Sequence, residues 1–202
     1  MTDGLSGTRG ARVRILPRAF FARDPREVAP ELLNKLLAAN DGRRGRIVEV
    51  EAYCGALDPA AHSFRGETAR TKSMFGPPGH LYVYFTYGMH WCANIACGDV
   101  GEGVGVLLRA LEPVAGLELM RAARPKAKTD RDLCRGPARL AQALGITGEH
   151  DGLSVRSGPF RVLDDGTAPP EAPTTGPRIG IRQAVHEPWR WHVPGSRFVS
   201  GR

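Results

Sequence analysis

A carboxylate, an arginine and four tyrosines are the residues of this sequence that could act together on a flat ring. Residues 73–98 contain no Lys, Arg, Asp or Glu in a chain that is 24% charged, and they hold three of its four tyrosines. The fourth, Tyr53, follows Glu51 by two positions. Aromatic side chains can stack on a planar ring while a carboxylate takes a proton beside it. This combination indicates chemistry on an aromatic substrate.

Glu51 is the candidate general base. In a strand predicted over 46–53, alternation puts Ile47, Glu49, Glu51 and Tyr53 on one face and Val48, Val50 and Ala52 on the other. An arginine on a neighbouring strand, Arg109, could keep the carboxylate ionised until it takes a proton from water. The alternative is an exposed glutamate that merely pairs with an arginine.

His62 and the tyrosines have structural alternatives as well. His62 could hydrogen-bond the edge of a substrate, but a lone histidine is more often a surface or satisfied core residue. Strand tyrosines are commonly ordinary core aromatics. These residues alone therefore leave both interpretations open.

The pattern of apolar residues predicts an α+β fold with a mixed, largely antiparallel sheet, surrounding helices and a protruding β-hairpin. A helix that begins near Pro30 would place Leu32, Leu33, Leu36 and Leu37 in the core. Strands over 81–87 and 91–96 would meet at a turn that holds Tyr87 and Met89 near its tip. The strand over 104–110 would stop at Pro113. Further strands are predicted over 153–155, 160–163, 179–181 and 190–193, and helices over 115–124 and 137–144.

Composition indicates a single domain over 15–202 behind a disordered tail over 1–14. The tail has no apolar segment typical of a secretion signal, so we expect a soluble cytoplasmic protein without a membrane span. The net charge of +7 favours a polyanionic partner, although only four basic residues are lysines and arginine preference can reflect genomic base composition. Four cysteines without a CxxC pair predict reduced, buried thiols; Cys92 and Cys97 could serve a metal only with unidentified partners.

Several motifs, in order and at matching spacing, resemble the alkyladenine (3-methyladenine) DNA glycosylase family. The similarity is collinear from about residue 15 to residue 200. The motifs are RIVEVEAY at 46–53, AAHS at 60–63, MFGPPGHLYVYFTYGMHWCAN at 74–94, VLLRALEP at 106–113, DLCRGP at 132–137, PRIGI at 177–181 and VPGS at 193–196.

The resemblance implies a monofunctional base-excision-repair enzyme without lyase activity. It would flip an alkylated or otherwise damaged purine out of double-stranded DNA and hydrolyse the N-glycosidic bond, leaving an abasic site. The lesions would include 3-methyladenine and 7-methylguanine; hypoxanthine and ethenoadenine are excised by some members and not by others. It also implies a monomer, associated with the nucleoid, that needs no metal, cofactor or obligate protein partner.

The resemblance also implies roles for individual residues. Glu51 would be the general base, and Arg109 with the main-chain carbonyl of Ile179 would help to hold the attacking water. Tyr53 and Tyr84 would sandwich the flipped base, with His62 beside them, and Asn94 would exclude normal guanine. Tyr87, with Met89, would fill the gap in the DNA. The implied DNA-contact residues are Tyr53, His62, Tyr84, Tyr87, Met89 and Asn94.

Two departures and two rival classes accompany the resemblance. Thr68-Ala69-Arg70-Thr71 stands where the family usually has Thr-Pro-Arg-Asn, and His90 replaces an aromatic residue of some members. A non-catalytic minor-groove or RNA-binding module would explain the charge and the aromatics, but it gives no reason for pairing Glu51 with Arg109. A zinc nucleobase deaminase would need H-x-E and P-C-x-x-C ligands, which this sequence lacks.

Overall fold

An antiparallel sheet carries the candidate residues through the middle of the molecule. In the structure, a computed structural model that describes residues 13–201, the strand order is β1-β7-β2-β3-β6-β5-β4, with β9 also paired to β3 and β8 to β9. The strands are β1 (Arg14–Ile15), β2 (Leu36–Ala39), β3 (Arg44–Tyr53), β4 (Leu81–Thr86), β5 (His90–Cys97), β6 (Val104–Ala115), β7 (Phe160–Asp164), β8 (Thr174–Gly176) and β9 (Arg190–His192). Every pairing among these strands is antiparallel, so the sheet is more uniform than the mixed sheet that the sequence predicts.

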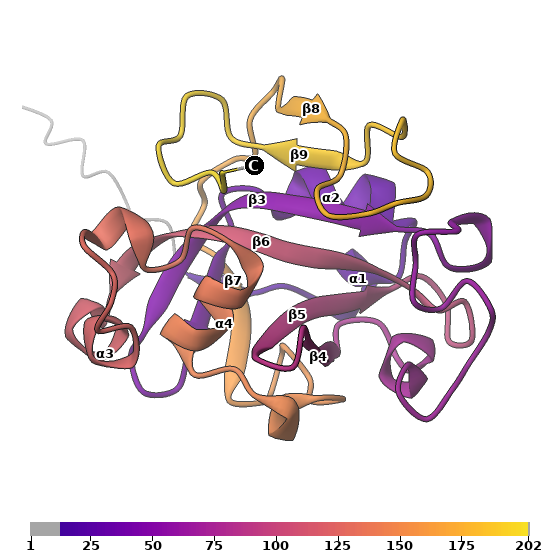
Figure 1. The fold of residues 1–202 in the computed structure, drawn as a ribbon, viewed down its shortest axis with the longest axis horizontal. Helices are drawn as coiled ribbons and strands as arrows, with labels where there is room; N and C mark the ends of the chain where they lie inside the picture. Colours follow the sequence, from indigo (N-terminus) through magenta and orange to yellow (C-terminus); the bar gives the residue numbers. More distant parts are fainter. Residues whose placement is uncertain (1–12, 202) are drawn as a thin grey trace, which may run out of the picture.

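Helices cover the sheet and complete an α+β domain. The helices are α1 (Arg18–Phe21), α2 (Pro25–Leu32), α3 (Leu117–Ala123) and α4 (Pro137–Leu144), with short 3-10 turns η1 (Gly55–Leu57), η2 (Lys72–Phe75), η3 (Asp130–Asp132) and η4 (Gly148–His150). α2 packs against β3 and β6, whereas α4 packs against β5 and β6. In Figure 1, β3 and β6 cross the centre, α4 lies in front of the sheet and α2 lies farther back. Apolar side chains from α2, α4 and the central strands form one buried cluster.

The leucines of the predicted first helix are divided between a helix and a strand. α2 begins at Pro25, earlier than expected, because the Asp24 carboxylate accepts the backbone N–H of Arg26 (2.7 Å) and caps the first turn. Leu33 leaves the helical conformation (ψ 141°), and Asn34 then takes a left-handed conformation (φ 67°) that turns the chain toward β2. Leu36 and Leu37 therefore lie in β2, and their burial comes from a sheet face.

Two further departures involve β3 and β6. The prediction that Pro113 ends a strand is wrong, because β6 continues to Ala115 and Pro113 stands opposite Gly45 beside a register shift. A second shift between Ile47 and Glu49 reverses the predicted alternation there. Ile47 joins the main core, and Val48 packs with Ala110 in a separate cluster.

Some predicted ends and strands also differ from the structure. Arg14, the last residue of the predicted tail, pairs in β1 with Asp164, whereas residues 1–12 lie outside the described residues. Residues 153–155 and 179–181 are not strands; Ser154 makes only an isolated bridge to His80. The predictions of α4, β7 and β9 are confirmed to within a residue or two.

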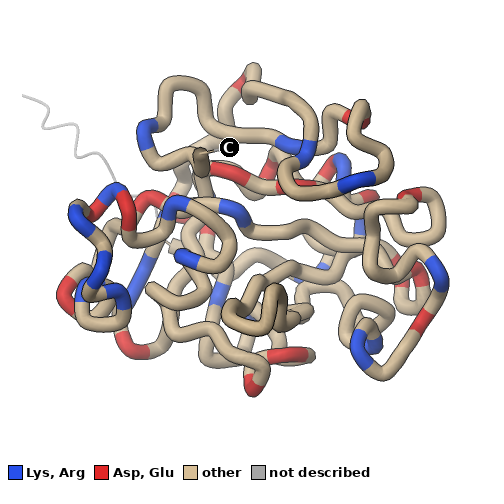
Figure 2. The backbone as a smooth tube through the Cα atoms, viewed as in Figure 1, with Lys and Arg blue, Asp and Glu red and all other residues tan. Residues whose placement is uncertain are grey.

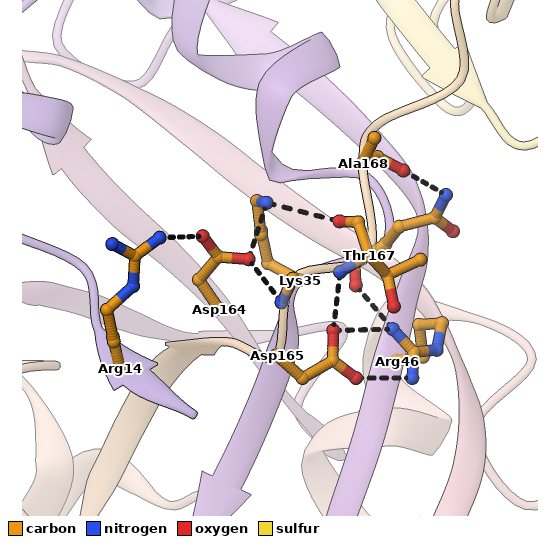
Figure 3. A network of polar contacts seen from close by, with 9 residues as sticks. Arg14, Lys35, Arg46, Asp164, Asp165, Thr167 and Ala168 are labelled. Atoms are coloured by element: carbon orange, nitrogen blue, oxygen red, sulfur yellow. Dashed lines mark hydrogen bonds and ion pairs between the residues drawn. The ribbon is translucent and has the colours of Figure 1, made fainter. Parts of the chain in front are cut away.

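A cluster of ion pairs ties β2, β3 and β7 together just beyond the end of α2 (Figure 3). Lys35, predicted in a helix, lies just before β2, and its Nζ contacts Asp164 Oδ1 (2.9 Å) and the Thr167 carbonyl (3.2 Å). Arg46 Nη2 pairs with Asp165 Oδ2 (2.8 Å). We call Lys35, Arg46, Asp164 and Asp165 the ion-pair clamp. Over residues 13–201, no helix has the length and apolar character needed to cross a membrane.

Candidate active site

A pocket of about 430 Å³ opens between β4, β5, β6 and the segment after β8. This volume falls in the range of small-molecule sites. We call it the base pocket, after the base that the resemblance implies as its occupant. Its lining includes seven of the nine residues that the sequence singled out, namely Tyr53, His62, Tyr84, Tyr87, Asn94, Arg109 and Ile179.

Glu51 lies behind this lining, fully buried, and the three groups that hold its carboxylate all line the pocket. Arg109 Nη1 lies 3.0 Å from Glu51 Oε1, and the Ile179 N–H donates to the same oxygen (2.8 Å). The Tyr53 hydroxyl donates to Oε2 (2.9 Å). The interpretation of Glu51 as an exposed strand residue is therefore wrong, because none of it is exposed.

The contact made by Ile179 also explains why residues 179–181 do not form a strand. The sequence singled out the Ile179 carbonyl, but the contact in the structure uses its N–H. An N–H that bonds a carboxylate cannot also join a sheet ladder. The chain thus bends at Ile179 and Gly180 beside the pocket.

Glu49 is a second buried carboxylate, which the sequence placed on the correct face without giving it a role. Its Oε1 accepts from Arg109 Nε (3.2 Å) and Arg190 Nη1 (3.0 Å), and its Oε2 accepts from the Ser200 N–H (2.7 Å). Arg109 therefore bridges Glu49 and Glu51, with its own third contact to Ser200 Oγ (3.2 Å). This double pairing fixes the guanidinium at one orientation. In the sequence, the two-residue spacing of Glu49 and Glu51 on one strand face could have indicated that both carboxylates meet the same arginine.

Burial sets the electrostatics of Glu51. It raises the pKa of the Glu51 carboxyl above its ordinary value of 4.5, and the Arg109 guanidinium opposes this rise. Burial and the nearby Glu51 charge raise the pKa of Tyr53, so its hydroxyl stays protonated and donates. A carboxylate whose ionised form is disfavoured accepts a proton more readily than a solvated one.

Three aromatic rings gather on one side of the pocket. Tyr82 and Tyr84 alternate onto the same face of β4 and stack with their centroids 5.5 Å apart. His62 meets Tyr84 edge-on (4.6 Å), and its Nδ1 lies 3.0 Å from the Tyr82 hydroxyl. Burial, and secondarily Arg70, lower the pKa of His62. The ring is therefore neutral at pH 7, and one of its nitrogens can accept a hydrogen bond.

Tyr53 is supported from behind by an ion pair that the sequence did not reveal. Arg178 stacks over the Tyr53 ring (4.6 Å) and over Trp189 (5.0 Å). Both guanidinium Nη atoms contact the Asp58 carboxylate, and this pair is fully buried. Asp58 and Arg178 are 120 residues apart in the chain, so no local pattern predicts their contact.

Asn94 and Arg70 complete the surroundings of the rings. Asn94 is 4% exposed, and its Nδ2 donates to the Tyr82 carbonyl (3.2 Å), which aims the amide at the pocket. The Arg70 guanidinium lies over Tyr84 (5.6 Å). Beside it, Thr71 exchanges hydrogen bonds with Thr68, including Thr68 N–H to Thr71 Oγ1 (2.9 Å). These bonds hold the loop in which this chain departs from the family pattern.

Tyr87 and Met89 lie at the turn between β4 and β5. Thr86 and His90 are the last paired residues, and the Met89 N–H donates to the Thr86 carbonyl (3.2 Å). Tyr87 and Gly88 both have positive φ (51° and 65°), as in the type I′ turns that favour hairpins. Tyr87 is 82% exposed and Met89 70%, although Tyr87 also reaches the base pocket. A bulky exposed side chain in the left-handed region is strained, which is typical of functional positions.

Potential metal-ligating side chains do not gather in the described part of the chain. Among residues 13–201, no three or more His, Cys, Asp or Glu side chains converge as a metal site would need. The four cysteines are buried free thiols. The pocket itself presents arginines and aromatic rings, with the carboxylates of Glu49 and Glu51 behind them.

Comparisons with known proteins agree with this chemistry. A family described as methylpurine-DNA glycosylase matches residues 19–197. A protein of Burkholderia lata is 66% identical over 189 residues, covering 93% of this chain and 91% of its own length. One of Burkholderia cenocepacia is 67% identical over 190 residues (93% and 91%), and one of Koribacter versatilis is 49% identical over 199 (95% and 96%). All three carry the name "Putative 3-methyladenine DNA glycosylase".

Proposed function

This chain belongs to the methylpurine-DNA glycosylase family, and from this premise we propose that it excises alkylated purines from double-stranded DNA with a water molecule activated by Glu51. Family membership supports the general activity of a DNA-repair glycosylase. The lesions, the flipping of the base and the role of each residue are parts of the proposal. The observation that carries it is the fully buried Glu51 carboxylate, held by three groups that line the base pocket.

Flipping would begin at the hairpin turn. Tyr87 would enter the gap left by the extruded nucleotide, and Tyr53 and Tyr84 would stack on the base inside the pocket. Extrusion costs a few kcal/mol, and each aromatic contact returns roughly 1–3 kcal/mol. Because these terms nearly cancel, a lesion that weakens pairing decides which bases enter. 3-Methyladenine and 7-methylguanine, which are cationic, would also stack well on electron-rich rings and leave more easily. Asn94 would oppose entry of normal guanine.

Hydrolysis would use the acceptor capacity that Glu51 retains. A carboxylate offers about four acceptor positions, and the contacts of Arg109, Ile179 and Tyr53 account for three. The remaining position, on Oε2, would accept the proton of a water that reaches it past the residues lining the pocket. As the glycosidic bond lengthens, the sugar gains positive charge that the carboxylate also stabilises. The water then attacks the anomeric carbon while Glu51 takes its proton.

The proposal is a monofunctional reaction that needs no amine nucleophile. A lyase would attack the sugar with an amine such as lysine. The described lining of the base pocket has no lysine, and Lys35 is held by Asp164 in the ion-pair clamp. We therefore expect an intact strand with an abasic site. We also propose that the protein acts as a monomer, because all of the groups in the reaction come from one chain.

The test is base release from a methylated duplex in the presence of EDTA. The proposal predicts free 3-methyladenine or 7-methylguanine, with strand breaks that appear only after alkali. Duplex binding without base release would contradict it and favour the alternative, a non-catalytic nucleic-acid-binding module of the same fold. Strand breaks without alkali would contradict the monofunctional mechanism.

A further inference from the structure

A second cavity, of about 470 Å³, lies between α4, the loop after α3 and the first residue of β5. We call it the basic pocket. Its polar lining residues are His90, Arg124, Lys126, Arg139 and Gln142. Three of these five carry a full positive charge, and the described lining has no Asp or Glu. The base pocket, by contrast, has carboxylates directly behind its walls.

The charges in the basic pocket are not balanced by neighbouring side chains. Burial and the charge of Arg139 lower the pKa of Arg124, which means that its cation is disfavoured where it lies. Within the described residues, Arg124 Nε is buried without a hydrogen-bond partner, and Lys126 and Arg139 form no ion pair. Asp132 is a carboxylate whose charge acts on Arg124 and Arg139, but it forms no ion pair with either of them and accepts from Thr129 Oγ1 (2.8 Å). An anion bound here would relieve the repulsion.

The basic pocket adjoins the base pocket. Pro137 lines the base pocket and Ala138, the next residue of α4, lines the basic pocket. Thr86 lines the base pocket and pairs across the hairpin with His90, which lines the basic pocket. Figure 2 shows Lys and Arg segments close together around α3 and the loop that follows it, with Asp and Glu segments between them. One extended polyanion can therefore reach both pockets.

We propose that the basic pocket binds a backbone phosphate of the DNA strand close to the flipped nucleotide. This inference rests on the proposed function, since it takes the occupant of the base pocket to be part of a DNA strand. Arg124 lines the pocket and is already oriented by its Nη1 bond to the Gln142 side chain (2.7 Å), so a phosphate would meet a guanidinium that is held in place. Arg139 and Lys126 supply exposed charge at the mouth. Such a contact fixes the register of the strand without reading its sequence.

The test removes the phosphate charge one position at a time. The probe is a duplex with a stable abasic-site analogue, in a series where a single neutral methylphosphonate replaces each phosphate around the lesion. Wild-type binding should weaken most at one position or two adjacent positions. In Arg139→Gln and in Lys126→Gln, the methylphosphonate at that position should reduce the affinity less than it does in wild type. Methylphosphonates at other positions should reduce it as much as in wild type. Each variant should also lower the slope of log Kd against log salt by about 0.9.

A matched control separates a specific site from general charge. Arg161 is an exposed arginine on β7, at the far end of the sheet from the β4–β5 hairpin. Arg161→Gln removes the same charge and should leave the methylphosphonate profile unchanged. A profile without a distinct position, or one that Arg139→Gln and Arg161→Gln alter equally, would overturn the inference. Binding of inorganic phosphate to the basic pocket, together with a flat duplex profile, would also overturn it, because the site would then bind a free anion.

The outcomes also separate this inference from the proposed function. A distinct phosphate position in a wild-type protein that releases no base would support the basic pocket and overturn the proposed hydrolysis. Base release with a flat methylphosphonate profile would support the proposed hydrolysis and overturn the phosphate site in the basic pocket.

Discussion

Strand β3 contributes to two clusters of charged side chains, one toward each end. Near its start, Arg46 pairs with Asp165 in the ion-pair clamp, where Lys35 pairs with Asp164. Near its end, Glu51 pairs with Arg109 beside the base pocket. Both clusters match carboxylates with basic groups at similar distances, 2.8 to 2.9 Å in the clamp and 3.0 Å at Glu51.

The two clusters nevertheless treat a carboxylate in opposite ways. Hydrogen bonds from Lys35 and Arg46 lower the pKa of Asp164 and Asp165, whose side chains keep 17% and 19% exposure. The Glu51 side chain has no exposure, and burial raises its pKa although Arg109 opposes the rise. Desolvation is thus the largest effect at Glu51, whereas a side-chain hydrogen bond is the largest at each clamp aspartate. The clamp stabilises its ionised state, whereas the site keeps a carboxylate ready to be protonated.

The largest expected effect comes from exchanging charge for an amide in each cluster. Glu51→Gln should lower the rate of base release by about 10²–10⁴, the usual contribution of a general base, without lowering the free energy of unfolding. Asp165→Asn should lower the free energy of unfolding by about 1–2 kcal/mol and leave base release unchanged. Urea denaturation and base-release rates on both variants check this. Similar effects of both substitutions on activity would break the contrast.

Removal of the buried lysine tests the clamp alone. Lys35→Met leaves Asp164 without its main partner and should lower the free energy of unfolding by about 2–3 kcal/mol. The control is Arg14→Gln, because Arg14 is 73% exposed and contacts the same carboxylate at 3.4 Å, so its loss should cost under about 0.5 kcal/mol. Equal losses from both variants, measured by urea denaturation at pH 7, would show that burial of Lys35 is irrelevant.

The pH dependence should differ in sign between the clusters. The clamp aspartates have folded pKa values below the ordinary 3.8, so their stabilisation is present above that pH and is lost as the pH falls toward the folded values. Glu51 has a folded pKa above 4.5, so its burial favours the folded state below pH 4.5 and disfavours it as the pH rises through the folded pKa.

Activity should consequently decline at a pH where the clamp is intact. Base release needs ionised Glu51 and should fall about tenfold per pH unit below its folded pKa, on an acid limb above pH 4.5. Profiles of kcat/KM and of thermal unfolding against pH, recorded on the same wild-type protein, provide the measurement. An acid limb at or below pH 4.5 would contradict the raised pKa.

The smallest effect is expected at the hairpin turn, outside both clusters. Tyr87→Gly relieves the positive φ at the turn and should raise the free energy of unfolding by about 0.5–1 kcal/mol. It should also weaken binding to a damaged duplex, since Tyr87 is the proposed wedge. Thermal unfolding and fluorescence of a base analogue next to the lesion report these two changes. Unchanged flipping in Tyr87→Gly would remove Tyr87 from the wedge role. A lower free energy of unfolding would contradict the strain at this position.

The sequence predicts which residues gather at the pocket better than it predicts the surrounding framework. Alternation in β3 correctly placed Glu51 beside Tyr53, because it depends only on local strand geometry. The division of the leucines at Asn34 was missed, since apolar residues can be buried by a helix or by a strand.

Contacts between distant segments were also beyond the sequence. The Asp58 to Arg178 pair joins two loops, and Ile179 donates its N–H to a carboxylate on a strand 128 residues earlier. Neither leaves a periodic signal. The bulge at Ile47 arises from pairing with β6 and likewise has no local signature.

The central claim is that Glu51 is the group that activates water, and single-turnover base release tests it most directly. Wild type and Glu51→Gln would each be mixed in excess with a duplex that carries one 3-methyladenine or 7-methylguanine, so that binding does not limit the rate. The account predicts release by wild type and, for Glu51→Gln, a bound duplex that keeps its base. Release by Glu51→Gln at a rate near that of wild type would contradict it.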